Sequence, residues 1–355
     1  MKNGFGICSA LAAVVFLSLL CQRNPVYDGS VDIEEQMSVW QYLKTYSIYQ
    51  DRVPDDPFEY SSAESLFEAV GDTSYTNYYN YVDDGVTASA ARNTDDFRVV
   101  YYEITDSTVL VSIREFSDAA YSEFLDLLPL MEKYRNIVVD LRGNGGGDLH
   151  ATDSIVECFL PARSGYIQTR YRDYSTKERS GYTVDWDTVW TARPAHAAFE
   201  GKNFSVLINR RTASASEILA SALKDCAGAY LVGERSYGKG IGQVRIPRTG
   251  RRMLSITFMQ IRGVSDRTGN YHRTDEYESS DKGLRPDTIP ADTRISGVGI
   301  DDDQIREIYY AVKLLERSAT VYEVRASVPG NLRWLNKSSS FNEMYIVSEP
   351  DPLGH

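Results

Sequence analysis

The sequence predicts an α/β fold, in which a sheet of buried strands is covered by helices. Three short apolar runs carry this prediction, at Ile137–Asp140, Ser205–Asn209 and Ala229–Gly233. Segments of helical periodicity alternate with these runs, which is typical of a covered α/β sheet. The chain has 355 residues, 42% of them hydrophobic and 25% charged, which is enough for one large domain and a smaller one.

Residues 1–21 are expected to be an export signal rather than part of the fold. Lys2 provides a positive start, and Ile7–Leu20 is an apolar run too short to span a bilayer comfortably. The run ends at Cys21, as in a lipoprotein signal, although the residues just before it depart from that pattern. We therefore expect an exported protein, either periplasmic or membrane-tethered in a bacterium, and leave lipidation of Cys21 open.

Residues 22–96 are expected to form a small helical region and a linker. Ile33–Tyr49 contains apolar residues at near-helical spacing, and Ala63–Val70 has the pattern of a second, short helix. The apolar residues of the first helix are Met37, Trp40, Leu43 and Tyr46.

Residues 97–317 are expected to form the main domain. Val99–Ile104 and Val109–Ile113 have the pattern of two strands joined by a turn, and Ser117 is placed to cap a helix after them. Asp302–Leu315 has one apolar face and is predicted to be a closing amphipathic helix.

Three features stay open at this point. Residues 160–200 are either a solvated surface insertion or a hairpin that contacts a substrate, and residues 318–355 form a tail with no interpretable pattern. Cys158 and Cys226 are either two buried thiols or a disulfide. The sequence gives no prediction of the oligomeric state.

Composition excludes some classes of function. The formal net charge of −12 argues against a nucleic-acid groove, which needs clustered positive charge. The four histidines are scattered without metal-ligand spacing, so neither a metal nor another cofactor is expected.

A serine and a lysine carry the candidate chemistry. Ser214 stands where a helix should begin, and Lys239 follows an apolar strand and lies between two glycines. A serine hydroxyl is a poor nucleophile until a base removes its proton. Lysine is such a base only as the neutral amine, which requires burial to lower its pKa. Gln243, four residues after the lysine, is placed to hydrogen-bond the amine.

Ser214 also has a plain structural interpretation. With Glu217 it forms a capping box, and taken alone it would more often be a helix cap than a nucleophile. The two roles are compatible, because a helix N-terminus offers free amides and a positive dipole end to an oxyanion. The amide of Ala215 is one natural donor.

The second oxyanion donor is expected from the glycine-rich segment Gly143–Gly147. Glycines after a buried strand allow the backbone to approach a ligand closely. Gly146 is the first choice and Gly147 the alternative.

The order and spacing of these motifs resemble the C-terminal processing peptidases, also called tail-specific proteases. Asp140–Gly147 reads Asp-Leu-Arg-Gly-Asn-Gly-Gly-Gly, and Gly283–Asp287 reads Gly-Leu-Arg-Pro-Asp, both similar to elements of that family. The resemblance covers roughly residues 97–317. It implies a crotonase-like spiral catalytic domain, a serine peptidase with a Ser-Lys dyad, and unfolded or flexible peptide substrates.

The resemblance also implies a role for each site residue. Ser214 would be the nucleophile and Lys239 the base, with Gln243 as their support. The oxyanion would be held by the amides of Ala215 and Gly146, and the acidic positions Glu217 and Asp225 would brace the structure.

The chain departs from many members of that family in one respect. Only 15 residues separate Tyr81 from Phe97, so the PDZ domain that many members carry there does not fit. Two alternatives remain open, a catalytically weak relative that binds peptides or another ligand, and an esterase-like hydrolase. Ser221 and Lys224 form a Ser-x-x-Lys pattern without its usual partner motifs, so we discount that pair.

Overall fold

The computed structural model divides the chain into two compact units. It describes residues 33–70, 77–80, 97–173, 182–193, 198–248, 252–263, 283–288 and 303–316. The predictions for residues 1–21, for Cys21 and for residues 318–355 lie outside this part of the chain. One unit comprises residues 1–81, 172–182 and 243–257, and the other comprises the remaining residues.

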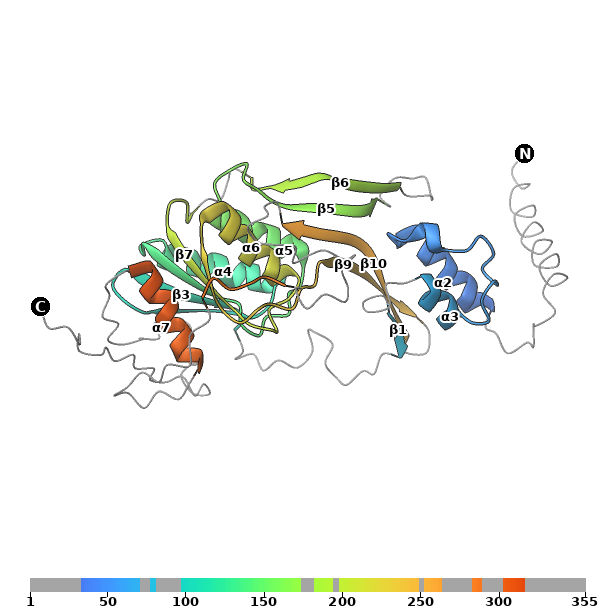
Figure 1. Ribbon diagram of the computed structural model, residues 1–355, viewed down its shortest axis with the longest axis horizontal. Coiled ribbons are helices and arrows are strands. Elements are labelled where there is room, and N and C mark those ends of the chain that lie inside the picture. Colours follow the sequence, from blue (N-terminus) through green and yellow to red (C-terminus); the bar gives the residue numbers. More distant parts are fainter. Residues whose placement is uncertain are drawn as a thin grey trace, which may run out of the picture. The chain divides into compact units, whose positions relative to one another are not determined.

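The larger unit is built on a five-stranded sheet in the order β2-β3-β4-β7-β8. Figure 1 labels β3 and β7 of this sheet, with α4 and α6 near them. Its strands are β2 (Val99–Glu103), β3 (Thr108–Ile113), β4 (Asn136–Asp140), β7 (Asn203–Ile208) and β8 (Tyr230–Gly233). β2 pairs antiparallel with β3, and the other neighbours pair in parallel. The predicted α/β fold class is therefore confirmed.

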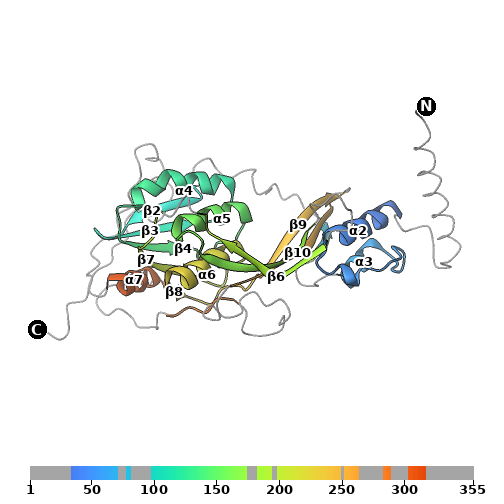
Figure 2. The same cartoon turned by 90° about the horizontal axis from the view of Figure 1, so that it is seen from above.

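Helices cover both faces of this sheet. Its helices are α4 (Asp118–Met131), α5 (Leu149–Phe159), α6 (Ala215–Ala227) and α7 (Asp303–Glu316). Alternate residues of β4 point to opposite faces of the sheet. Ile137 and Val139 belong to a core cluster with residues of α4, α5 and α6, whereas Val138 belongs to a cluster with residues of α7. Figure 2 shows β4 and β7 between α4 and α7. Burial on both faces explains why these strands have continuous apolar sequences.

Helix α5 was not predicted from the sequence. Its buried face includes the polar residues Thr152, Ser154 and Glu157, which interrupt the apolar periodicity. The Glu157 carboxylate is 1% exposed and accepts hydrogen bonds from Arg193 Nε at 2.5 Å and Arg193 N at 3.1 Å. The ion pair with Arg193 therefore permits the burial of Glu157, which the pattern of apolar residues along the chain did not indicate.

The region 160–200 contains a strand pair. β5 (Gly165–Asp173) pairs with β6 (Tyr182–Thr191), and residues 167–171 of β5 also pair antiparallel with residues 259–263 of β10 (Arg252–Gly263). The strand pairing that the hairpin interpretation requires is present, whereas contact with a substrate stays a prediction.

The smaller unit contains the two predicted N-terminal helices, α2 (Ile33–Tyr46) and α3 (Ala63–Val70), and the short 3₁₀ helix η1 (Gln50–Arg52). β1 (Asn77–Asn80) pairs with residues 252–255 of β10. Its core includes Val39, Leu43, Leu66, Phe67, Leu254 and Ile256.

Helix α2 buries most of the predicted face, since Leu43 is fully buried and Trp40 and Tyr46 are partly buried against the same core, and Met37 is the exception. Met37 is 36% exposed, whereas Val39 and Gln36 are fully buried. The Gln36 Nε2 atom donates to the carbonyls of Pro57 and Tyr60, at 2.9 and 2.7 Å. A polar residue thus occupies the buried face because backbone acceptors meet it there.

Both cysteines in the described part of the chain are free thiols. Cys158 is buried and donates to the carbonyl of Ser154, and Cys226 is half-buried and donates to the carbonyl of Gly165. Of the two predicted alternatives, the structure therefore has the thiols. Among the described residues, no helix has the length and apolar character needed to cross a bilayer.

The core of the larger unit can be tested on α4 with two neighbouring residues. Phe124 is fully buried against Phe159 and Phe199, whereas Leu125 is 39% exposed. We expect Phe124→Ala to lower the free energy of unfolding by about 3–5 kcal/mol, because it leaves a cavity. The control Leu125→Ala should change it by less than about 1 kcal/mol. Urea unfolding followed by circular dichroism measures both, and equal effects would contradict the assigned packing.

Candidate active site

Three loops follow the strands β4, β7 and β8. The glycine loop (residues 141–147) follows β4, the serine loop (residues 209–214) follows β7, and the lysine loop (residues 234–240) follows β8. The carboxyl ends of parallel strands lie at one edge of a sheet, where open α/β sheets bind ligands. The topology therefore places the three predicted motifs at the same edge.

Hydrogen bonds join the glycine loop to the serine loop. Gly143 N donates to Asn209 Oδ1 at 3.0 Å, and Thr212 Oγ1 donates to the carbonyl of Leu141 at 2.9 Å. Thr212 is fully buried, so its hydroxyl has no competing water. Sequence reasoning assigned no role to Asn209 or to Thr212, because neither belongs to a motif that names its partner.

Asn144 is the central residue of this junction. Its carbonyl accepts hydrogen bonds from Ala213 N and Ser216 Oγ, both at 3.0 Å. Its side chain is fully buried, donates to the carbonyl of Ile113 at 2.9 Å and accepts from Gly146 N at 2.9 Å. The amide of Gly146, our first choice as oxyanion donor, is thus engaged within its own loop.

Gly146 instead allows the glycine loop to pack closely against the backbone at Ser214 and Ala215. A Cβ atom on this residue would lie 2.9 Å from Ser214 Cβ and 3.0 Å from Ala215 N, and its φ of +101° disfavours any other residue. The glycine loop is therefore packed directly against the predicted nucleophile.

The amide of Gly147 is free of the hydrogen bonds that hold the glycine loop to the described residues around it. Phe116 N donates to the carbonyl of Gly146 at 3.2 Å, and Asp148 N donates to the carbonyl of Phe116 at 2.9 Å. In this parallel bridge the amide of Gly147 points away from Phe116. Gly147 is exposed, and its amide has no hydrogen-bond partner among the described residues. The predicted alternative donor is therefore available for a ligand.

Ser214 precedes α6 in a strained backbone conformation. Its φ of 57° and ψ of −119° are unfavourable for a residue with a side chain. The residue is half-buried, and the amide of Ala215 behind it has no partner within the described residues. This geometry leaves one amide donor of the helix N-terminus next to the serine, as the oxyanion role requires.

Glu217 connects Ser214 to the lysine loop. The carboxylate is fully buried, and its Oε2 atom accepts from Ser214 N at 2.9 Å and from Lys239 N at 2.8 Å. Its Oε1 atom accepts from Ser236 Oγ at 2.5 Å and from Gly238 N at 2.7 Å. Burial raises the pKa of Glu217 to about 7, although all four hydrogen bonds act to lower it.

The other predicted residues are placed differently. Lys239 is half-buried in the lysine loop. Gln243 lies on β9 (Ile241–Arg248), in residues assigned to the other unit, so its contact with Lys239 stays a prediction. Asp225 lies 11 residues after Ser214 on α6, which corresponds to roughly 16 Å along the axis. Asp225 is therefore not part of the immediate surroundings of the serine.

An ion-pair network holds the start of the glycine loop. Arg142 pairs with Asp140 through two hydrogen bonds, at 2.9 and 2.7 Å, and its Nη1 atom donates to Glu307 of α7 at 2.8 Å. These contacts keep the pKa of Arg142 above its ordinary value despite burial. Burial raises the pKa of Glu307. Sequence reasoning missed Glu307, because it lies 165 residues from Arg142.

The Gly-Leu-Arg-Pro-Asp segment supports the lysine loop. Leu284 N donates to Ser236 Oγ at 2.6 Å, which extends the network of Glu217. Asp287 accepts from Lys224 Nζ at 2.6 Å and from Leu231 N at 2.8 Å. Lys224 is therefore ion-paired, which agrees with discounting the Ser-x-x-Lys pattern.

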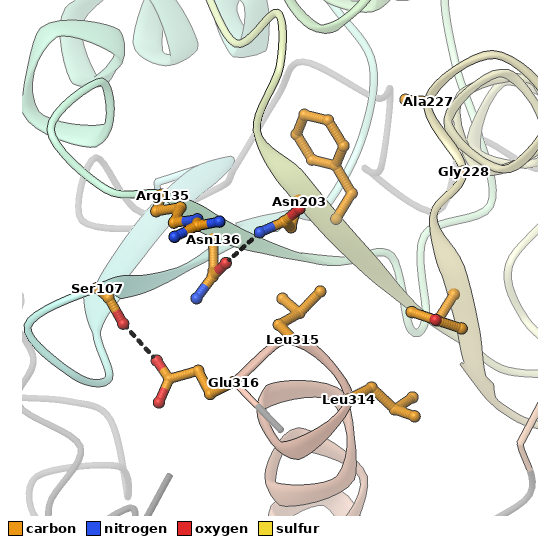
Figure 3. Close-up of a pocket in the computed structure, with 11 residues that line it drawn as sticks. Ser107, Arg135, Asn136, Asn203, Ala227, Gly228, Leu314, Leu315 and Glu316 are labelled. Atoms are coloured by element: carbon orange, nitrogen blue, oxygen red, sulfur yellow. Dashed lines mark hydrogen bonds between the residues drawn. The ribbon is translucent and has the colours of Figure 1, made fainter. Parts of the chain in front are cut away.

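A cavity of about 770 Å³ lies at the opposite edge of the sheet (Figure 3). Ser107, Asn136, Asn203 and Tyr230, which line it, stand just before or at the first residues of the parallel strands. The three loops of the candidate site follow the other ends of these strands, so this cavity does not contain Ser214. Within the described residues, His, Cys, Asp and Glu side chains form no group of three that could hold a metal ion.

The close approach of the glycine loop predicts different effects for two neighbouring glycines. A Cβ atom on Gly147 would lie 2.0 Å from the carbonyl oxygen of Phe116, whereas one on Gly145 would meet nothing within 4 Å. We expect Gly147→Ala to lower the free energy of unfolding by more than about 3 kcal/mol. Gly145→Ala should change it by less than about 1 kcal/mol. Urea unfolding measures both, and a Gly147→Ala variant as stable as Gly145→Ala would refute the assigned contact.

The raised pKa of Glu217 predicts a pH-dependent stability. The pKa is 4.5 in an unperturbed glutamate and about 7 here, so the folded state retains the proton more tightly than the unfolded state. This contribution to stability is complete below pH 4.5 and is lost as the pH rises through 7. Relative to Glu217→Gln, the free energy of unfolding of the wild type should therefore fall by roughly 3 kcal/mol between pH 4.5 and 8.

Urea unfolding at several pH values tests this dependence. Glu234→Gln is the matched control, because Glu234 is half-exposed on the lysine loop and pairs with Arg210 at 3.6 Å. Its difference from the wild type should stay constant over this range. An increase in the relative stability of the wild type with pH would show that Glu217 has a depressed pKa instead.

Comparison with known proteins identifies the family of the chain. The sequence pattern of peptidase family S41 matches residues 107–287, about half of the chain. The chain is 29% identical over 221 residues to a carboxyl-terminal-processing protease of Synechocystis sp. (strain ATCC 27184 / PCC 6803 / Kazusa), covering 62% of this chain and 46% of that protein. It is 32% identical over 150 residues to the carboxy-terminal processing protease CtpB of Bacillus subtilis (strain 168), covering 42% of this chain and 28% of that protein. The matched part is thus less than half the length of these relatives.

A solved structure has a similar fold. A lipoprotein from Streptococcus agalactiae superimposes with a TM-score of 0.51 at 11% identity, over 81% of this chain and 96% of that protein. At this identity the similarity concerns the fold alone. The resemblance to the C-terminal processing peptidases is confirmed by the match over the motifs described above, and the chain belongs to peptidase family S41.

Proposed function

We propose that the protein is a serine endopeptidase that hydrolyses peptide bonds with Ser214 and Lys239 as a catalytic dyad. The observation that carries this proposal is the position of Glu217 Oε2, which accepts from Ser214 N at 2.9 Å and from Lys239 N at 2.8 Å. Since both nitrogens bind one oxygen atom, they are at most about 6 Å apart. The backbones of the proposed nucleophile and base are therefore close together, although 25 residues separate them, and this proximity supports the dyad.

In the proposed reaction, Ser214 Oγ attacks the scissile carbonyl and the neutral amine of Lys239 takes its proton. The resulting lysine ammonium then protonates the leaving amine, and an acyl-enzyme remains. Lys239 removes a proton from water, and the attacking hydroxide releases the acid product. Ser214 Oγ then takes a proton from the Lys239 ammonium, which returns both residues to their starting states.

The oxyanion is proposed to bind between the amides of Ala215 and Gly147. Both are unengaged in the described part of the chain, whereas the amide of Gly146 donates to Asn144 Oδ1. Donors fixed before the reaction lower the barrier because they need no reorganisation when charge develops. The role of Gly146 is then to let the glycine loop contact Ser214.

Other parts of the assignment stay proposals of the same kind. Gln243 would orient the amine of Lys239, Asp225 would brace α6, and residues 97–317 would form the catalytic domain. The substrates would be unfolded or flexible peptides of exported proteins. Selection of C-termini stays open, because the 15 residues between Tyr81 and Phe97 are too few for a PDZ domain at that position. A catalytically weak binding relative and an esterase-like hydrolase are the alternatives.

Casein cleavage by purified variants tests the dyad. We expect Ser214→Ala and Lys239→Ala each to lower the cleavage rate at least about 1,000-fold, because each removes a reacting group. Ser221→Ala is the matched control, since this serine lies on α6 and donates to the carbonyl of Ile218. Its activity should stay close to that of the wild type.

Each contrary outcome has a separate meaning. Equal activity in all four proteins would eliminate the dyad. Cleavage of ester but not peptide substrates by the wild type would favour the esterase, and peptide binding without any hydrolysis would favour the binding relative. Circular dichroism confirms that the inactive variants are folded.

A further inference from the structure

Tyr237 is an exposed aromatic residue in the lysine loop. Its relative exposure is 54%, the highest among the large hydrophobic side chains in the described part of the chain. The others with high exposure lie on α2, on α4 and at the start of β8, and are Met37, Leu125, Leu130 and Tyr230. A single exposed apolar residue is ordinary on a protein surface, so the position of Tyr237 has to carry the argument.

The backbone that carries this ring is fixed on both sides. Ser236 N donates to the carbonyl of Leu284 at 3.2 Å, and Tyr237 N donates to the carbonyl of Thr212 at 2.9 Å. Gly238 N and Lys239 N both donate to the buried carboxylate of Glu217. Four consecutive amides are thus bound, and a ring on so constrained a backbone loses little further freedom when a ligand covers it.

The same hydrogen bonds place Tyr237 beside the candidate dyad. Tyr237 is bonded to Thr212, two residues before Ser214, and Lys239 shares an oxygen of Glu217 with Ser214. The lysine loop and the serine loop therefore run next to each other, with residue 237 opposite residue 212. A tyrosine side chain spans about 6–7 Å, which is the spacing of two residues in an extended peptide.

We propose that the ring of Tyr237 forms one wall of a substrate subsite that takes an apolar side chain next to the scissile bond. This subsite rests on the proposed peptidase function. Arg210 and Glu234, on the two adjoining loops, pair with each other at 3.6 Å. An aromatic face covered by an apolar side chain removes two apolar surfaces from water at once.

The first test measures binding without catalysis. A series of fluorescent peptides, each with leucine at one position in an otherwise Gly-Ser background, is titrated into Ser214→Ala and into Ser214→Ala with Tyr237→Ala. One leucine position should bind about tenfold more weakly to the double variant, and Tyr237→Phe in place of Tyr237→Ala should restore the affinity. Equal affinities at every position, or no binding at all, would overturn the subsite.

The second test identifies cleavage sites in casein by mass spectrometry. Wild type and Tyr237→Phe should share a preference for apolar residues at one position beside the cut. Tyr237→Ala should lose that preference, with kcat/KM lowered mainly through KM. Tyr230→Ala is the matched control, since Tyr230 is also exposed but lies at the opposite edge of the sheet. An unchanged preference in Tyr237→Ala would overturn the proposal.

The two tests separate the failure of the subsite from the failure of the peptidase function. If the wild type does not cleave casein, the peptidase proposal fails, and the binding series still decides whether Tyr237 contacts peptide. If cleavage depends on Ser214 and neither test responds to Tyr237, only the subsite fails.

Discussion

The buried carboxylate of Glu217 is the interaction on which the candidate site depends. Four donors from the serine and lysine loops converge on its two oxygens, and no part of the side chain is exposed to water. A carboxylate transferred from water to a protein interior loses its hydration, and only such a set of donors replaces it. The opposition between burial and hydrogen bonding leaves the pKa of this group near 7. Because the donors come from both loops, Glu217 also connects the serine loop to the lysine loop.

The rest of the site is arranged around this connection by the parallel sheet. β4, β7 and β8 run in the same direction, so the loops that follow them meet at one edge. Asn144 then joins the glycine loop to the serine loop, and Arg142 fastens the start of the glycine loop to α7. Each loop is held by contacts from another, which is how irregular backbone keeps a fixed geometry without the regular hydrogen bonds of a helix or sheet.

Strain and free donors coincide at the proposed oxyanion position. Ser214 has a positive φ, and Gly146 approaches it more closely than any residue with a side chain could. Such conformations persist only where the surroundings determine them, and they are concentrated at functional sites. The amides of Ala215 and Gly147, which have no partners among the described residues, lie next to this strained position. The local conformation and the proposed chemistry therefore have the same structural cause.

The sequence by itself determined most elements of the main sheet and the candidates for the reacting groups. Apolar runs indicated the strands of the main sheet, because strands buried on both faces consist mostly of apolar residues. Ser214, Lys239 and the glycine loop were recognisable because their spacing and the family motifs are local properties of the chain. The helix α5 was missed, since the ion pair of Glu157 with Arg193 forms only in the folded protein.

Only the tertiary structure decided how these groups are held. Whether an amide is free or engaged depends on what the folded chain places opposite it, and this distinguishes Gly147 from Gly146. The shared oxygen of Glu217, the role of Asn144 and the distant partner Glu307 all involve contacts between loops far apart in sequence. Local patterns cannot encode such contacts, because they report on periodicity along the chain and not on which loops meet at the edge of a sheet.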